Sequence, residues 1–201
     1  MLLAHNYAVL VPDSRGHGSS DGDLITFGVK EADDTRRWVE WLAETTHPRK
    51  IYGLGESMGA ANLLQSLPIE PQLRAVVAEA PFANLPRIAY DRLGMFLRIG
   101  PRWRRPLFWP VIDTAVLYGR FRYGIWLPDA SPERAVARSS TPVLLIRDGR
   151  DDRMPSWHID ALLAANPGLA LWDVPEAIHT GAFGAEPEEF ARRVTGWFET
   201  H

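Results

Sequence analysis

A serine lies between two glycines in the pentapeptide Gly55-Glu-Ser-Met-Gly59. The apolar run 51–54 comes directly before it, and a helical run begins at Ala60. The pattern G-x-S-x-G between a strand and a helix is typical of a nucleophile elbow, a strained turn that exposes the serine hydroxyl. We expect the flanking glycines to remove side chains that would clash in this turn. Ser57 is therefore the predicted nucleophile, and the amide of Met58 is the predicted donor to the oxyanion that forms when a carbonyl is attacked.

A serine hydroxyl needs a base that takes its proton, and histidine is the usual one. His179 follows the last predicted strand, so it should lie at the carboxyl edge of a parallel sheet, beside the serine turn. His17 lies in a glycine-rich turn at the same edge and is its rival, whereas His158 falls inside a helical pattern. The chain order serine, acid, histidine favours His179.

An acid that orients the histidine should follow a strand between Ser57 and His179. The loop after the apolar run 143–146 contains Asp148, Asp151 and Asp152. The residues alone assign the acid to this loop and leave the choice among the three aspartates open.

Short strand-like runs alternate with helical runs along the chain, which predicts an α/β protein with a mostly parallel, doubly wound sheet. The expected strands are 7–11, 51–54, 75–78, 143–146 and 169–174, and the expected helices are 31–45, 57–67, 156–165 and 186–199.

The segment 82–127 interrupts this alternation. It contains 10 of the 21 aromatic residues and has eight arginines against two aspartates. Its four prolines, at 86, 101, 106 and 110, predict several short helices rather than one long helix. We therefore expect a core formed by 1–81 and 128–201, with a helical cap inserted at 82–127.

Three segments together carry a resemblance to a known family. The stretch 7–22 resembles the strand-four turn of α/β-hydrolases, and 55–59 resembles their nucleophile elbow. The stretch 142–155 resembles their strand-seven signature, P-x-L-x-I-H-G-x-x-D-x-x-V-P, with Arg147-Asp148 in place of His-Gly. A match without gaps places the acid of the triad on Asp151, whereas counting from Gly149 would place it on Asp152. His179 matches the catalytic histidine of the family.

The resemblance is strongest to the branch with prolyl-oligopeptidase-type peptidases, monoacylglycerol lipases and membrane-associated acyl-protein thioesterases. It implies a serine hydrolase that cleaves an ester, thioester or amide through an acyl-enzyme, with a cap between strands six and seven. The first three strands of the family, with the His-Gly motif that supplies a second oxyanion donor, have no counterpart, which predicts an N-terminally truncated sheet. The alternative is a catalytically impaired remnant that acts as a binding or membrane-surface module.

The composition excludes several classes of protein. The chain has no cysteine, which rules out disulfides, thiolate metal sites and a cysteine nucleophile. With 22 basic against 25 acidic residues, it lacks the basic excess of a nucleic-acid-binding protein. No apolar run reaches the roughly 18 residues of a membrane-spanning helix, and no signal peptide is recognisable. We expect a cytoplasmic protein that needs no metal or organic cofactor and acts on a small-molecule or acyl substrate.

Aromatic and arginine residues alternate in the predicted cap, a composition suited to the headgroup region of an anionic membrane. We therefore expect peripheral membrane binding through the cap, against the simpler interpretation that these side chains only pack on one another. The aromatic residues are Trp103, Phe108, Trp109, Tyr118, Phe121, Tyr123 and Trp126, and the arginines are Arg98, Arg102, Arg104, Arg105, Arg120 and Arg122.

Overall fold

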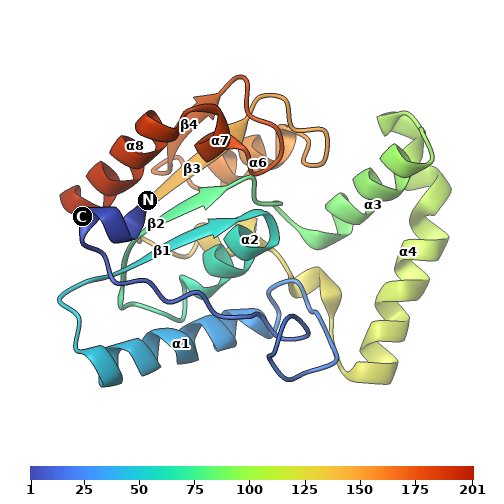
Figure 1. Ribbon diagram of the computed structural model, residues 1–201. Coiled ribbons are helices and arrows are strands. Elements are labelled where there is room, and N and C mark those ends of the chain that lie inside the picture. Colours follow the sequence, from blue (N-terminus) through green and yellow to red (C-terminus); the bar gives the residue numbers. More distant parts are fainter.

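Four parallel strands form a single sheet in the computed structural model, which describes residues 1–201 (Figure 1). They are β1 (Ile51–Glu56), β2 (Leu73–Glu79), β3 (Val143–Asp148) and β4 (Ala170–Val174), and they lie side by side in the order of the sequence. Because every pair is parallel, all carboxyl ends meet at one edge of the sheet. The α/β prediction is confirmed, and the serine turn and the acid loop leave the sheet at this common edge.

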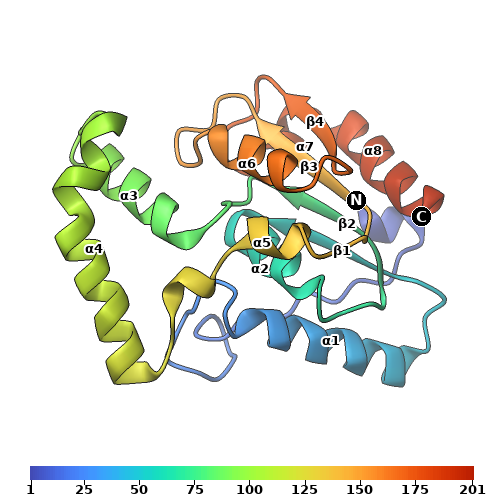
Figure 2. The same ribbon diagram turned by 180° about the vertical axis from the view of Figure 1, so that it is seen from behind.

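Helices cover both faces of the sheet (Figures 1 and 2). Alternate residues of β2 show why: Val76 and Ala78 belong to one apolar core, and Ala75 and Val77 belong to the other. The first core packs against α1 (Glu31–Thr46), α2 (Ser57–Ser66), α5 (Pro132–Val136) and α6 (Trp157–Ala165). The second packs against α7 (Ala182–Ala185), α8 (Pro187–Thr200) and the short 3-10 helix η1 (Leu2–His5).

The expected strand at 7–11 does not form. Residues 8–12 make no backbone–backbone hydrogen bond, and the side chain of Val11 is 85% exposed. A β-strand forms only where it hydrogen-bonds to a neighbouring strand. Residues 7–11 have no such neighbour, since β1, at the edge of the sheet, pairs only with β2. The apolar pattern of 7–11 was therefore not sufficient to predict a strand.

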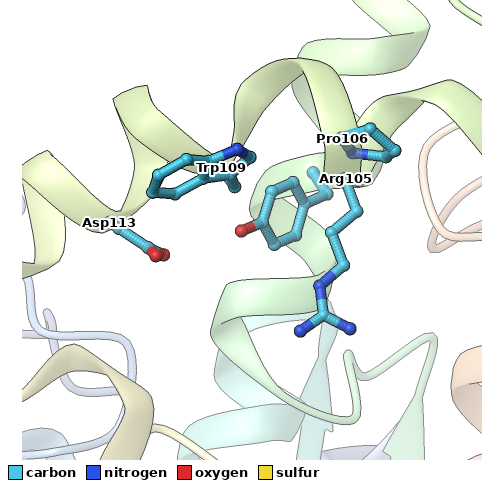
Figure 3. A pocket seen from close by; sticks show the side chains of 5 residues that line it. Arg105, Pro106, Trp109 and Asp113 are labelled. Atoms are coloured by element: carbon cyan, nitrogen blue, oxygen red, sulfur yellow. The ribbon is translucent and has the colours of Figure 1, made fainter.

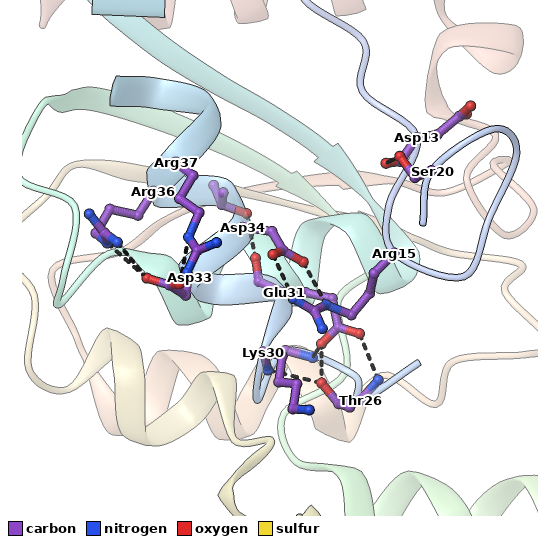
Figure 4. A network of polar contacts seen from close by, with 12 residues as sticks. Asp13, Arg15, Ser20, Thr26, Lys30, Glu31, Asp33, Asp34, Arg36 and Arg37 are labelled. Carbon is purple, nitrogen blue, oxygen red and sulfur yellow. Dashed lines mark hydrogen bonds and ion pairs between the residues drawn. The ribbon is translucent and has the colours of Figure 1, made fainter. Parts of the chain in front are cut away.

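The loop before α1 is tied down by a polar network (Figure 4). The buried carboxylate of Glu31 accepts hydrogen bonds from the amides of Thr26 and Gly28, at 2.6 and 2.8 Å. Arg15 donates twice to Asp34, each time at 2.6 Å. These contacts hold the loop, including the segment around Phe27, against the first turn of α1.

Between β2 and β3 the chain leaves the sheet and forms α3 (Leu85–Phe96) and α4 (Pro101–Tyr123), which stand apart from it in both views (Figures 1 and 2). The expectation of short helices is wrong for α4, which continues for 23 residues through Pro106 and Pro110. Phe108 and Ile112, one turn apart, are buried on the same side of α4. Each proline removes one backbone hydrogen bond, but the packing of this face keeps the helix intact. The division into a core and an 82–127 cap stays a prediction.

One side chain links this pair of helices to the core. Asp91 on α3 accepts a hydrogen bond from Arg104 of α4 at 2.6 Å and another from the indole of Trp157 on α6 at 2.9 Å.

Figure 3 shows a hollow between α3 and α4, lined by Tyr90, Arg105, Pro106, Trp109 and Asp113. None of the helices has the length and apolar character needed to cross a membrane.

Candidate active site

Ser57 is the first residue of α2, at the turn where the chain passes from β1 into the helix, and its φ is 51°. Few residues other than glycine adopt this left-handed conformation, so the turn is strained. A Cβ on Gly55 would lie 2.8 Å from the Cα and N atoms of Ala60, which explains why this position needs a residue without a side chain. A Cβ on Gly59 would meet nothing within 4 Å. The expectation that both glycines avoid a clash is therefore right for Gly55 and wrong for Gly59.

The structure brings the predicted serine, histidine and acid into one hydrogen-bonded chain. The Nε2 atom of His179 lies 2.8 Å from the hydroxyl oxygen of Ser57. Its Nδ1 atom lies 2.7 Å from the Oδ2 atom of Asp151. The three residues come from the turn after β1, the loop after β3 and the loop after β4, so the parallel sheet assembles them at its carboxyl edge.

Both carboxylate oxygens of Asp151 are hydrogen-bonded, Oδ2 to His179 and Oδ1 to the backbone of its own loop. Its Oδ1 atom accepts hydrogen bonds from the amides of Arg153 and Met154, at 2.7 and 2.8 Å. Burial raises the pKa of Asp151, but the hydrogen bonds from His179, Met154 and Arg153 outweigh it and leave the pKa below its usual value. Asp152 is exposed and makes no hydrogen bond. The hydrogen bond to His179 therefore distinguishes Asp151 from Asp152, a choice that the residues alone left open.

The rival histidine, His17, and the helical His158 lie elsewhere. His17 is exposed, and its ring contacts the backbone oxygen of Arg15 at 3.0 Å. His158 is fully buried on α6, where its Nδ1 atom accepts a hydrogen bond from the amide of Ala83 at 3.0 Å. Burial, with a smaller contribution from the charge of Arg87, lowers the pKa of His158 to about 3. His158 is therefore a neutral core residue.

Side chains that could ligate a metal also gather here. Asp148, Asp151 and His179 each offer a ligand atom, and these atoms lie within 4.8 Å of one another. Both ring nitrogens of His179 are already hydrogen-bonded, to Asp151 and to Ser57. A metal bound to this histidine would have to replace one of those bonds, so these residues are better suited to move a proton than to hold a cation.

An apolar pocket of about 530 Å³ opens beside Ser57 and His179. Residues of the core line one side, and residues of α3 and α4 line the other. Two arginines, Arg92 and Arg153, complete the lining, which contains no acidic residue. The apolar lining includes Phe27, Met58, Phe82, Leu85, Ile88, Ile112 and Val116.

Sequence reasoning missed two residues at this edge. Phe27 lines the pocket although it lies in a loop before the first helix, and no sequence pattern marks it. Glu79 is fully buried at the end of β2, and its only signal is a charged residue that ends an apolar run.

Comparison with known protein families identifies one that matches nearly the whole chain. The sequence model of the alpha/beta hydrolase family matches residues 1–193. The chain is 31% identical over 196 residues to the uncharacterized protein YqkD of Bacillus subtilis strain 168, a match that covers 96% of this chain and 60% of YqkD. It is 29% identical over 167 residues to the uncharacterized protein Rv2307c of Mycobacterium tuberculosis, a match that covers 79% of this chain and 47% of Rv2307c. The chain thus spans about half to three-fifths of the length of these relatives.

Solved structures share the fold. The esterase Pf2001 of Pyrococcus furiosus superposes with a TM-score of 0.74 at 24% identity, covering 99% of this chain and 73% of the esterase. The protein BpoC of Mycobacterium tuberculosis H37Rv superposes with a TM-score of 0.60 at 21% identity, covering 94% of this chain and 80% of BpoC. At such identities the likeness concerns the arrangement of strands and helices.

Proposed function

Because this chain belongs to the alpha/beta hydrolase family, we propose that it is a serine hydrolase that cleaves a carboxylic ester, thioester or amide. The observation that carries the proposal is the continuous chain of hydrogen bonds from Asp151 through His179 to Ser57. The ring of His179 joins an acid on one side to a strained serine hydroxyl on the other. That arrangement is the one that activates a serine.

The reaction follows from these contacts. Nε2 of His179 takes the proton of Ser57 while the serine oxygen attacks the substrate carbonyl, and the carbonyl oxygen becomes an oxyanion. The amide of Met58, in the first turn of α2, is the proposed donor to that oxyanion. His179 then protonates the leaving alcohol, thiol or amine, and an acyl-enzyme remains on Ser57. A water molecule, deprotonated by His179, releases the acid and restores the serine.

Asp151 keeps the histidine in the required tautomer. Its carboxylate accepts the Nδ1 proton of His179, which leaves Nε2 free to accept the serine proton. The lowered pKa of Asp151 keeps this carboxylate charged at neutral pH, so it stabilises the imidazolium that forms during attack.

The pocket beside Ser57 supports an acyl substrate. Its lining is largely apolar, so it favours a hydrocarbon chain over a polar one. The acyl group would lie between the core and α3, with its carbonyl carbon at the serine oxygen.

A fluorophosphonate probe tests the proposal, because it reacts only with an activated serine. We expect covalent labelling of the wild type, complete loss in Ser57→Ala, and unchanged labelling in Ser156→Ala, which alters an exposed serine without side-chain hydrogen bonds. A wild type that does not label, or a Ser57→Ala protein that still does, would contradict the proposed nucleophile. The first result would favour the impaired remnant.

A second candidate function is peripheral binding to an anionic membrane through α4. Trp103, Trp109 and Phe121 are exposed by 57%, 54% and 86%, although aromatic side chains of this size are usually buried. Exposed arginines lie between them on the same helix. Such a surface can bury its rings among lipid headgroups while its guanidinium groups meet phosphate.

A further inference from the structure

Two buried acids that the proposed mechanism does not use lie next to the site. Glu79 ends β2 and is fully buried, and Asp148 ends β3 and is 6% exposed. Glu79 is in register with Ile146 of the adjacent strand, so Asp148 lies two residues further along that strand. Charged side chains are seldom buried without a partner.

Each acid uses one oxygen to hold the backbone that follows His179. The Oδ2 atom of Asp148 accepts a hydrogen bond from the amide of Thr180 at 2.8 Å. The Oε1 atom of Glu79 accepts one from the amide of Ala182 at 2.9 Å. The segment that carries the histidine is thus attached to the ends of two neighbouring strands.

The second oxygen of each acid has no donor. Glu79 Oε2 and Asp148 Oδ1 are buried and have no hydrogen-bond partner among the protein's donors. The two acids end neighbouring strands and bind amides only two residues apart in the same loop, at Thr180 and Ala182. Two ionised carboxylates repel each other in a buried site, but a single proton between them satisfies both orphan oxygens.

The backbone that these acids hold is strained. Thr180, directly after His179, has a φ of 55°, which is unfavourable for a β-branched residue. Such conformations persist only where surrounding contacts enforce them, and the hydrogen bonds of the two acids supply such contacts.

We propose that Glu79 and Asp148 share one proton, and that the resulting acid pair positions His179 for the reaction. Neither acid touches Ser57 or the reacting carbonyl, so both are positioning residues. The second half of the inference rests on the proposed function, because it assigns a purpose to the position of His179. The shared proton does not depend on that function.

The surroundings of the two acids set the pH at which the pair releases its proton. Glu56, in register with Glu79 on β1, adds negative charge beside it, and Asp151 and His179 lie beside Asp148. Burial is the main cause that raises the pKa of Glu79 to about 8, with Asp148 and Glu56 adding to it against the hydrogen bond from Ala182. Burial also raises the pKa of Asp148.

The sign of the pH effect on stability follows. The unfolded chain releases the Glu79 proton near the usual value of 4.5, whereas the folded chain keeps it to about pH 8. The folded state therefore binds more protons in this range, so the free energy of unfolding falls as pH rises through it. Above about pH 8, both the folded and the unfolded chain have released this proton, so the pair no longer makes the free energy of unfolding depend on pH.

Chemical unfolding of wild type and Glu79→Gln tests the shared proton. Glutamine keeps an oxygen for the Ala182 amide and offers Asp148 a permanent donor, so this variant has no proton to lose. Between about pH 5 and pH 8, we expect the wild-type unfolding equilibrium constant to rise relative to that of the variant, by up to about tenfold per pH unit. Glu176→Gln, at an exposed glutamate, should follow the wild type. Parallel profiles of wild type and Glu79→Gln would overturn the shared proton, and Asp148→Asn gives the same test should Glu79→Gln not fold.

The rate of fluorophosphonate labelling tests the positioning role. At neutral pH, we expect Glu79→Ala to label about 100-fold more slowly, because the histidine is misplaced, and Glu79→Gln to keep most of the rate. Above about pH 8 the wild-type rate should fall toward that of Glu79→Ala, while Glu79→Gln keeps its rate. Equal losses in the alanine and glutamine variants would overturn the positioning role. Absence of labelling even in the wild type would instead count against the serine hydrolase, and with it the positioning role, while the unfolding profiles still decide whether the proton is shared.

Discussion

At the scale of single residues, two aspartates that are neighbours in the sequence have different surroundings. Asp151 receives hydrogen bonds from the ring of His179 and from the amides of Arg153 and Met154. Asp152 points to solvent. Since both have the same chemistry, any difference in their effect on activity must come from geometry.

Replacement of these two carboxylates tests that difference. Asp151→Asn should lower turnover of a chromogenic ester by about four orders of magnitude, because the amide no longer fixes the tautomer of His179. Asp152→Asn removes the same charge from the same loop and should leave turnover close to that of the wild type. Unfolding curves of both variants serve as the check that the fold is intact. A larger loss in Asp152→Asn than in Asp151→Asn would place the acid one residue further along the chain.

At the scale of elements, the turn from β1 into α2 depends on a close approach of two backbones. Gly55, the last residue but one of β1, faces the backbone of Ala60, which is fully buried one turn into the helix. This contact sets the direction in which the helix leaves the strand, and so the position of the Ser57 hydroxyl. Gly59 has open space where a side chain would be.

Alanine at these two glycines gives a matched pair of variants. Gly55→Ala should destabilise the protein by about 1–3 kcal/mol, because the new methyl group pushes the helix away from the strand. It should also slow fluorophosphonate labelling. Gly59→Ala lies in the helix and should be neutral or stabilising, by up to about 1 kcal/mol, since alanine favours the helix more than glycine does. Urea unfolding measures the stability of both variants. Equal losses of stability would show that the contact between Gly55 and Ala60 does not limit which residue fits at position 55.

At the scale of the whole molecule, α3 and α4 form an arm whose outer surface differs from the rest of the chain. The structure revises which side chains this surface presents. Phe108, which the sequence grouped with the exposed aromatics, is buried at 6% exposure. Arg104 is paired with Asp91 at 2.6 Å and is also largely buried. The outer surface available to a membrane therefore contains Trp103, Tyr118 and Phe121 with unpaired arginines of α4, whereas Trp109 lines the hollow between α3 and α4.

Co-sedimentation with liposomes tests membrane binding by this surface. We expect the protein to pellet with anionic vesicles, less so as salt rises, and to lose binding when Arg102, Arg105 and Arg120 are replaced by alanine. Replacement of three exposed arginines outside the arm, Arg37, Arg138 and Arg150, removes the same charge and should leave binding unchanged. Equal pelleting with neutral vesicles, or none with either, would leave the aromatic surface without a membrane role.

Local pattern by itself determined much of the fold. The strand–serine–helix arrangement at 51–66, the later strands and the closing helix follow from apolar periodicity and from turn residues, which act over a few neighbours. Because parallel strands share one carboxyl edge, the same patterns also predicted that Ser57, the aspartate loop and His179 would meet. The family resemblance favoured Asp151 for the acid and kept Asp152 as the alternative.

Tertiary structure decided what depends on a partner distant in the chain. The apolar run at 7–11 did not become a strand because no neighbour pairs with it, and α4 kept its length through two prolines because it packs on one face. The Glu79–Asp148 pair joins residues 69 positions apart, a distance over which local periodicity carries no information. Local patterns specify the conformation of a segment, whereas burial and pairing depend on which segments meet, and only the folded chain brings these two acids beside the loop of His179.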